Sequence, residues 1–194
     1  RFSIGTTCVS KGNLEASISE TVNAAFRSQP VTVASTRSPL AAPSDCADGS
    51  RAAYCDLVDF VMAREWRDDV GVALLGGRQE IVEGDQVILD IEAPSDLPII
   101  RVSYIDTNGQ VVNLKPVTLA GGLRRSAFVT RAEVAPPFGE EMVIVVAGSS
   151  PELSDDRPFT ETLTSFADYL DRLNTEAGDD VALNFVTVTT QPAS

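Results

Sequence analysis

The 194 residues include no histidine, only three cysteines and few basic side chains. Without histidine, a Ser–His or Cys–His nucleophile pair cannot form, and three cysteines alone do not complete a zinc site. The 15 lysines and arginines stand against 28 aspartates and glutamates, which gives a net charge of −13. Because this charge repels phosphates and anionic headgroups, we expect neither nucleic acid nor a membrane surface as a partner.

Long apolar runs and nucleotide-binding motifs are missing as well. No window approaches the roughly 18 uninterrupted apolar residues of a transmembrane helix, so we expect no membrane insertion within this chain. The segment GVALLGGR has the glycine spacing of a phosphate loop, but Gly77 replaces its lysine and Arg78 its Ser or Thr. The glycine-rich, HRD and DFG motifs of kinases are absent. We therefore expect no cofactor and no enzymatic activity.

Adjacent carboxylates are the remaining candidates for acid–base chemistry, at Asp68–Asp69, Glu140–Glu141, Asp155–Asp156 and Asp179–Asp180. Catalysis by two carboxyl groups needs them held across a cleft in unlike environments. Each pair here lies within a polar loop or at a strand end. We interpret the pairs as solvated turns.

Hydrophobic residues make up 43% of the chain, enough for a substantial core, and their pattern changes near residue 69. Residues 1–69 predict a small α/β domain: a hairpin from Phe2 to Ile18, a helix after Ser19, a strand at 31–34 and an amphipathic helix at 51–66. Arg1 replaces an initiating Met and no leader follows it, so we expect the chain to derive from a longer protein.

Residues 70–194 alternate between apolar and polar side chains in several short runs. Strands are predicted at 70–75, 86–92, 99–106, 110–114, 127–134, 141–147 and 181–190. A helix with N-cap Thr160 and a seam from Leu163 to Leu173 ends at Gly178. The predicted class is α+β: a small α/β portion followed by a mainly antiparallel β-sandwich-like domain with one C-terminal helix.

The clearest pattern is Gly84 to Leu114, which predicts an antiparallel meander of three strands. Its second turn, Asp106–Gly109, offers two oxygen ligands but lacks the later acidic ligands of a calcium loop. Asn-Gly also supplies the positive φ angles of a hairpin turn. We therefore predict a turn and no metal site.

Three cysteines allow one disulfide with a thiol left over, in three pairings. Cys55 borders the apolar stripe of the 51–66 helix and can reach Cys8 on a neighbouring strand or Cys46 in the preceding loop. We favour Cys8–Cys55 and keep Cys46 as the alternative partner, with three buried thiols as the remaining interpretation. A disulfide would indicate an oxidising compartment.

Five segments between residues 83 and 190 follow one another in a distinctive order: EGDQVILDIEAPSD, YIDTNGQVVNLKP, PPFGEEMVIVVAGSSP, RPFTET and NFVTVTT. Together they resemble a bacterial domain of unknown function, found at the C-terminal ends of Ser/Thr protein kinase-like receptors and caspase-like proteins. TTCVSKGNLEAS and AAYCDLVDF are similar, over a shorter stretch, to the cysteine-containing region between a membrane span and this domain. Pro98 departs from the usual glycine and predicts an edge position for its strand.

The resemblance implies a non-catalytic sensor or interaction module outside the cytoplasmic membrane, periplasmic and tethered by a span upstream of residue 1. Its partner would be a protein or a cell-envelope ligand. An alternative is a structural or adaptor part of an envelope or secretion assembly, bound through a sheet edge.

Two features are candidates for binding. Arg124, Arg125 and Arg131 form a basic patch that could meet a carboxylate-bearing partner, or be an ordinary solvated strand edge. The turn Pro136–Gly139 carries the ring of Phe138, which either faces a partner or packs back on its own sheet.

Overall fold

The computed structural model describes Cys46, 53–67, 69–76, Arg78, 80–118 and 125–193, the last range without the side chains of 125–132. The chain divides into two compact units, Arg1–Ala34 and Ser35–Ser194, and every described residue belongs to the second. The elements predicted before Ala34, and Cys8, lie outside the described residues.

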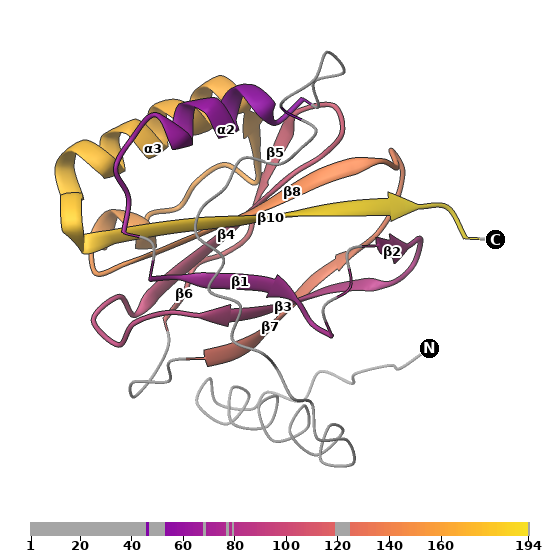
Figure 1. The fold of residues 1–194 in the computed structure, drawn as a ribbon, viewed down its shortest axis with the longest axis horizontal. Coiled ribbons are helices and arrows are strands. Elements are labelled where there is room, and N and C mark those ends of the chain that lie inside the picture. Colours follow the sequence, from indigo (N-terminus) through magenta and orange to yellow (C-terminus); the bar gives the residue numbers. More distant parts are fainter. Residues whose placement is uncertain are drawn as a thin grey trace. The chain divides into compact units, whose positions relative to one another are not determined.

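The second unit combines two β-sheets with a layer of helices (Figure 1). Its elements are α2 (Cys55–Met62), β1 (Gly71–Leu74), β2 (Glu80–Val82), β3 (Gln86–Glu92), β4 (Ile99–Ile105), β5 (Gln110–Asn113), β6 (Val117–Thr118), β7 (Arg125–Glu133), β8 (Glu140–Gly148), η2 (Pro151–Ser154), β9 (Thr160–Thr162), α3 (Leu163–Ala177), η3 (Gly178–Asp180) and β10 (Val181–Gln191). The predicted α+β class and mainly antiparallel, sandwich-like architecture with a C-terminal helix are confirmed.

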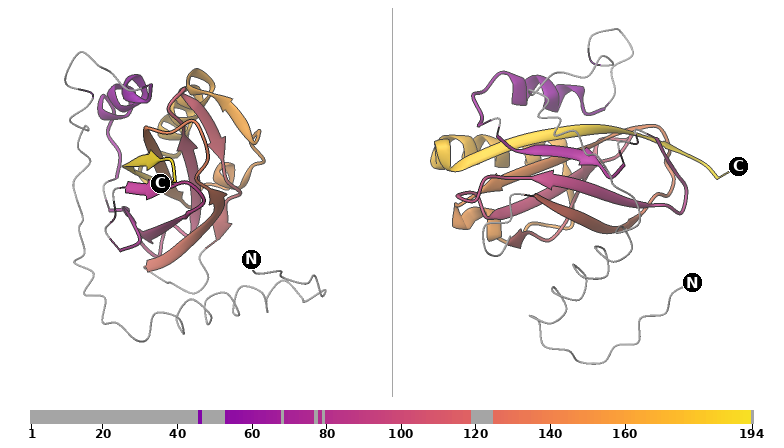
Figure 2. Two further views of the ribbon diagram at one scale, coloured as in Figure 1. Left: turned by 90° about the vertical axis from the view of Figure 1, so that its right-hand side faces the viewer. Right: turned by 60° about the horizontal axis from the view of Figure 1, so that its bottom comes forward.

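The larger sheet has the order β2-β10-β8-β4-β5-β9, with β6 paired to β4, and the smaller has the order β1-β3-β7. All named pairs are antiparallel except that of β2 with β10. β8 and β10 supply the longest ladder, in the middle of the larger sheet. Figure 2 shows β10 crossing the molecule between α2 on one side and the smaller sheet on the other.

Alternation in β8 explains this layering. Met142, Ile144 and Val146 face a core that they share with α2 and α3. Val143 and Val145 face the second core, between the two sheets. Because both faces are covered, β8 is almost continuously hydrophobic, as expected of a central strand.

The helix α2 belongs to the same compact unit as the sheets. Leu57 and Val61 share one core with Met142 of β8 and Leu170 of α3. α2 therefore packs with the sheets in the unit that begins at Ser35, and the helix within the predicted range 51–66 spans Cys55–Met62.

The predicted three-stranded meander is only partly correct. β4 and β5 form the expected hairpin, but β3 pairs with β1 and β7 in the other sheet. The six residues between β3 and β4 cross from one sheet to the other. Pro98 immediately precedes β4, so its missing N–H removes no ladder bond, and β4 lies inside its sheet rather than at the predicted edge.

Two local predictions concern turns and caps. Asp106 Oδ1 accepts from the backbone N–H groups of Asn108 and Gln110, which confirms the hairpin turn. Of the two residues expected to have a positive φ, Gly109 has one, at 78°, and Asn108 does not. The α3 N-cap is Thr162, whose Oγ1 accepts from Ser165 N at 3.2 Å, and not the predicted Thr160, which lies in β9. Gly178, at a φ of 51°, ends the helix as predicted.

No helix in the described part of the chain is both long and apolar enough to cross a membrane.

Candidate functional site

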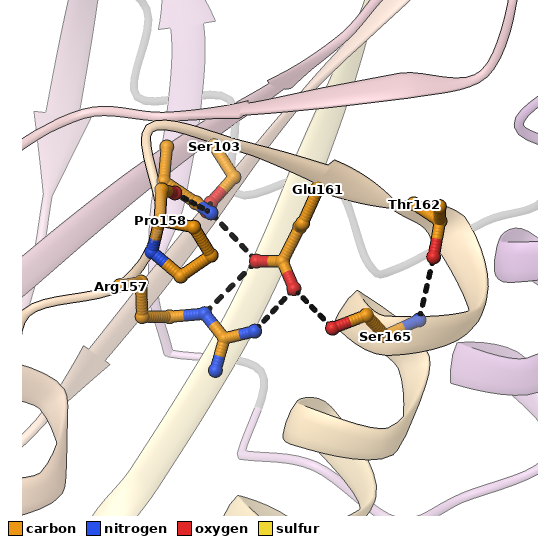
Figure 3. Close-up of polar contacts among 7 residues, drawn as sticks. Ser103, Arg157, Pro158, Glu161, Thr162 and Ser165 are labelled. Carbon is orange, nitrogen blue, oxygen red and sulfur yellow. Dashed lines mark hydrogen bonds and ion pairs between the residues drawn. The ribbon is translucent and has the colours of Figure 1, made fainter.

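A polar network, buried at Ser103 and Asn113 and exposed at Ser165, lies where the β4–β5 hairpin meets β9 and the first turn of α3. We call Ser103, Asn113, Arg157, Glu161 and Ser165 the Glu161 network (Figure 3). β4 pairs with β5 and sets Ser103 opposite Asn113, while β9 pairs with the other edge of β5 and carries Glu161. Two sheet registers therefore bring together residues 103, 113 and 161.

Each carboxylate oxygen of Glu161 accepts two hydrogen bonds. Oε1 accepts from Asn113 Nδ2 at 2.6 Å and from Arg157 Nε at 2.9 Å. Oε2 accepts from Ser165 Oγ at 2.7 Å and from Arg157 Nη2. Four donors fill the lone-pair directions of a carboxylate, so Glu161 has no acceptor site left for a ligand.

The electrostatics of the site follow from this geometry. Burial alone would raise the pKa of Glu161, whose side chain is 3% exposed, but the hydrogen bonds from Arg157, Ser165 and Asn113 outweigh burial and lower the pKa. The carboxylate is thus ionised at neutral pH and a weak general base. Ser103 Oγ donates to Asn113 Oδ1 at 2.8 Å, and an amide oxygen does not activate a hydroxyl. The arrangement favours a structural role for both serines over nucleophilic catalysis.

The network also fixes the backbone ahead of β9. Asn113 Nδ2 donates to Pro158 O at 3.0 Å, and the backbone N–H of Asn113 donates to Phe159 O at 2.8 Å. The backbone bond extends the β5–β9 ladder by one residue, and the side-chain bond holds Pro158 next to it. The backbone of Pro158 and Phe159 is therefore held against the sheet although both residues are exposed.

A second arginine anchors the segment before the network. Arg101 is 2% exposed, and its Nη2 donates to Leu153 O at 2.8 Å and to Asp155 O. The guanidinium of Arg157 stacks over the ring of Tyr169 at 3.8 Å, and that of Arg101 lies 5.9 Å from the same ring. Burial raises the pKa of Tyr169, against the effect of both arginines. The two cations thus tie the 151–159 segment to β4 and α3.

Phe159 is the functional candidate that emerges from this scaffold. Its side chain is the most exposed of the large hydrophobic residues in the described chain, at 71%. The three residues that follow Phe159 in the chain help to line an open depression of about 540 Å³, whose lining is Asn108, Gly109, Gln110, Thr160, Glu161 and Thr162. An exposed aromatic ring on a segment that is anchored through its backbone is suited to contacting another molecule.

A larger depression, of about 640 Å³, lies between the C-terminal ends of α2 and α3 and includes Arg64 and Arg67. Both cations are already paired. Arg64 Nη2 lies 2.6 Å from Asp171 Oδ1, and Arg67 bonds Asp69 at 2.6 Å and Asp96 at 2.9 Å. This hollow therefore offers no free positive charge to an anionic ligand.

The basic patch and Phe138, both predicted to bind a partner, have different outcomes in the structure. Arg124 lies outside the described residues; Arg125 and Arg131 lie in β7, with side chains outside the described set, so the basic patch stays a prediction. Phe138 is half-buried and packs against the core between the sheets. Of the two arrangements open for Phe138 it adopts the second, and we no longer assign it to binding.

The disulfide in the structure differs from the favoured prediction. Cys46 and Cys55 form a disulfide, with Cα atoms 5.3 Å apart, so the favoured Cys8–Cys55 pairing is wrong and the alternative is correct. Cys55 is fully buried at the start of α2, and its disulfide partner comes nine residues earlier in the sequence. Among the described residues, no group of three His, Cys, Asp or Glu side chains is placed to hold a metal ion.

Sequence reasoning did not identify Glu161, Arg157, Asn113 or Phe159 as site residues. One signal was available: Arg157 and Glu161 are four residues apart in RPFTET, a spacing that pairs charges on a helix. Here the pair forms across an extended segment instead. No family model matches the chain, and no curated protein matches it.

Proposed function

We propose that this chain is a non-catalytic, extracytoplasmic interaction or sensor module of a bacterial membrane-anchored signalling protein of the Ser/Thr kinase-like kind. The observation that carries the proposal is Phe159, exposed on a segment that the Glu161 network and Arg101 hold in place. Preorganised aromatic side chains lower the entropic cost of association and are enriched in interfaces.

Two further features support the location and the signalling context. The Cys46–Cys55 disulfide fits an oxidising compartment. RPFTET and NLKP, two segments on which the resemblance rests, contain Arg157, Glu161 and Asn113, so the similarity includes the residues that position Phe159. The acidic net charge favours a partner that is neutral or basic at its contact surface.

The alternative, a structural or adaptor part of an envelope or secretion assembly, is favoured by one observation. β9 and the nine-residue β7 are terminal strands of the two sheets as described, and terminal strands can pair with a strand of another chain. Such a partner would be recognised mainly through backbone hydrogen bonds.

Site-specific photocrosslinking tests the proposal. A photoreactive phenylalanine analogue replaces Phe159 in the full-length protein in its own cells, and a matched one replaces Val82, which is 40% exposed on β2. We expect a discrete crosslinked partner from position 159, accessible to reagents outside the cytoplasmic membrane, and none from position 82. Equal crosslinking at both positions, or products only with cytoplasmic proteins, would contradict the proposal. Crosslinks that depend on β7 or β9 backbone pairing would favour the alternative.

A further inference from the structure

Glu141 is buried on the apolar face between the two sheets. It lies in β8 and is 2% exposed. Residues 141, 143 and 145 lie on the same face of β8, and Val143 and Val145 belong to the inter-sheet core. In the β8–β10 pairing, Glu141 lies opposite Val188. A carboxyl group therefore occupies a position at which the pattern of β8 calls for a hydrophobic residue.

The carboxyl of Glu141 is poorly compensated. It has a hydrogen bond with the side chain of Thr190, whereas its Oε2 has no hydrogen-bond partner among the described residues. None of the ion pairs between described residues includes it. An ionised carboxylate in this place is costly, because burial removes its hydration and no described side chain forms an ion pair with it.

β7 carries Arg131 near this end of the sandwich, and its side chain lies outside the described set. The charged groups with described side chains on the surrounding elements form no ion pair with Glu141. They are Arg78 before β2, Glu80 and Glu83 in and after β2, Asp85, Asp106, Glu133 and Glu140. All are exposed except Asp106, which is half-buried. Its Oδ1 already accepts hydrogen bonds from two backbone N–H groups of its own turn. Six of the seven are carboxylates and cannot serve as counter-ions for Glu141.

Thr190 connects Glu141 to the chain segments at this end. The backbone N–H of Thr190 donates to Gly139 O at 2.8 Å, and that of Gly139 donates to Thr190 O at 3.1 Å. Thr190 is also the partner of Ile81 in the short parallel pairing of β2 with β10. Displacement of the Glu141 side chain toward water would therefore disturb β2, the end of β10 and the Pro136–Gly139 turn together.

We propose that the protonation state of Glu141 controls the opening of this end of the sandwich. When the carboxyl group is protonated this end stays closed, and when the proton is lost to solvent this end opens; we call this device the latch. The inference is independent of the crosslinking partner of Phe159. Burial raises the pKa of Glu141 to about 7, against the hydrogen bond with Thr190. The closed state is favoured fully below the ordinary value of 4.5 and loses this advantage as pH rises through about 7.

Hydrogen exchange of backbone amides measures the opening. The reporters are Thr190 N–H and Glu83 N–H, which donate to Gly139 O and Gln191 O. After correction for intrinsic exchange, we expect their protection to fall by up to about 100-fold between pH 5 and pH 8, while the β8 amides facing β4 change little. In Glu141→Gln the fall should disappear, because the amide cannot ionise. Glu133→Gln, an exposed carboxylate on β7, is the matched control and should behave like the wild type.

A direct titration of the Glu141 carboxyl group tests the proposal without any substitution, and so also applies if Glu141→Gln does not fold. Carbon-13 NMR of the Glu141 carboxyl in the unmodified protein should give a midpoint near 7. A midpoint near 4.5 would overturn the latch, as would a pH-dependent loss of protection that survives in Glu141→Gln.

Discussion

Replacing Glu161 by glutamine tests whether the Glu161 network holds the 151–159 segment. The substitution preserves size but introduces an NH2 group where the wild type accepts from four donors. If the amide nitrogen takes the place of Oε1, it faces Asn113 Nδ2 and Arg157 Nε. If it takes the place of Oε2, Ser165 can rotate to accept, but Arg157 Nη2 still opposes it. Neither orientation satisfies the site.

The magnitude follows from burial. Removal of the charge leaves Arg157, with a side chain only 11% exposed, without its counter-ion. Breaking a buried pair on one side costs about 3–5 kcal/mol. Because Arg157 keeps its contact with the Tyr169 ring, we expect the lower end, about 3 kcal/mol, out of a total stability of about 5–15 kcal/mol for a domain.

Urea unfolding followed by the fluorescence of Trp66, the single tryptophan, measures this loss. Ser165→Ala is the matched control: it removes one of the four donors and should cost about 1 kcal/mol. The lowered pKa of Glu161 adds a signature in pH. Its contribution is present above the ordinary value of 4.5, is lost as pH falls through the lower folded pKa, and should vanish in Glu161→Gln. A loss in Glu161→Gln no larger than in Ser165→Ala would refute the reasoning.

Two further substitutions test packing and the disulfide. In Gly148→Ala the new Cβ would lie 2.4 Å from Leu153 Cδ1 and 2.8 Å from Asp180 O, so we expect a melting temperature lowered by a loss of about 1–3 kcal/mol; Gly71→Ala, with its nearest atom at 3.5 Å, should be almost neutral, and equal effects would count against the packing argument. Joint replacement of Cys46 and Cys55 by serine opens a link across a separation of 9 residues and should cost about 3 kcal/mol in oxidising buffer. Reductant should produce the same loss in the wild type and none in the variant, and an unchanged wild type would contradict this expectation.

Elements with strong local patterns could be predicted from the sequence. The strand at 86–92 and the helix that ends at Gly178 follow from alternation and from a C-cap glycine, both of which are local properties. The placement of β3 in a different sheet from β4 could not be predicted, because alternation shows that a strand has one buried face and not which strand it pairs with. The short strands β2, β6 and β9 have no pattern of their own and exist through pairing with longer neighbours.

The candidate site could not be predicted either, because it too depends on tertiary structure. Glu161 lies in a polar run, RPFTETLTS, that reads as a solvated loop. Its burial depends on β5, β9 and α3 meeting at one point, which is a property of the tertiary structure. Cys46–Cys55 was within reach of sequence reasoning, because Cys46 lies in the segment that leads directly into the Cys55 helix. The neighbouring-strand alternative was preferred on the basis of a hairpin that lies outside the described residues.

Among the described residues, Glu161 and Glu141 have opposite effects on stability as pH changes. Glu161 is compensated by four donors, so its contribution is lost on the acidic side, whereas Glu141 has an oxygen without a partner and its closed state is lost as pH rises through about 7. Both groups are satisfied only in a window between the lowered pKa of Glu161 and the raised pKa of Glu141. Stability should therefore have a maximum in mildly acidic solution, with Glu161→Gln flattening the acidic limb and Glu141→Gln the alkaline limb. If one substitution changed both limbs, the two carboxylates would be coupled through β8 and β4, and the latch could not be treated as a local device.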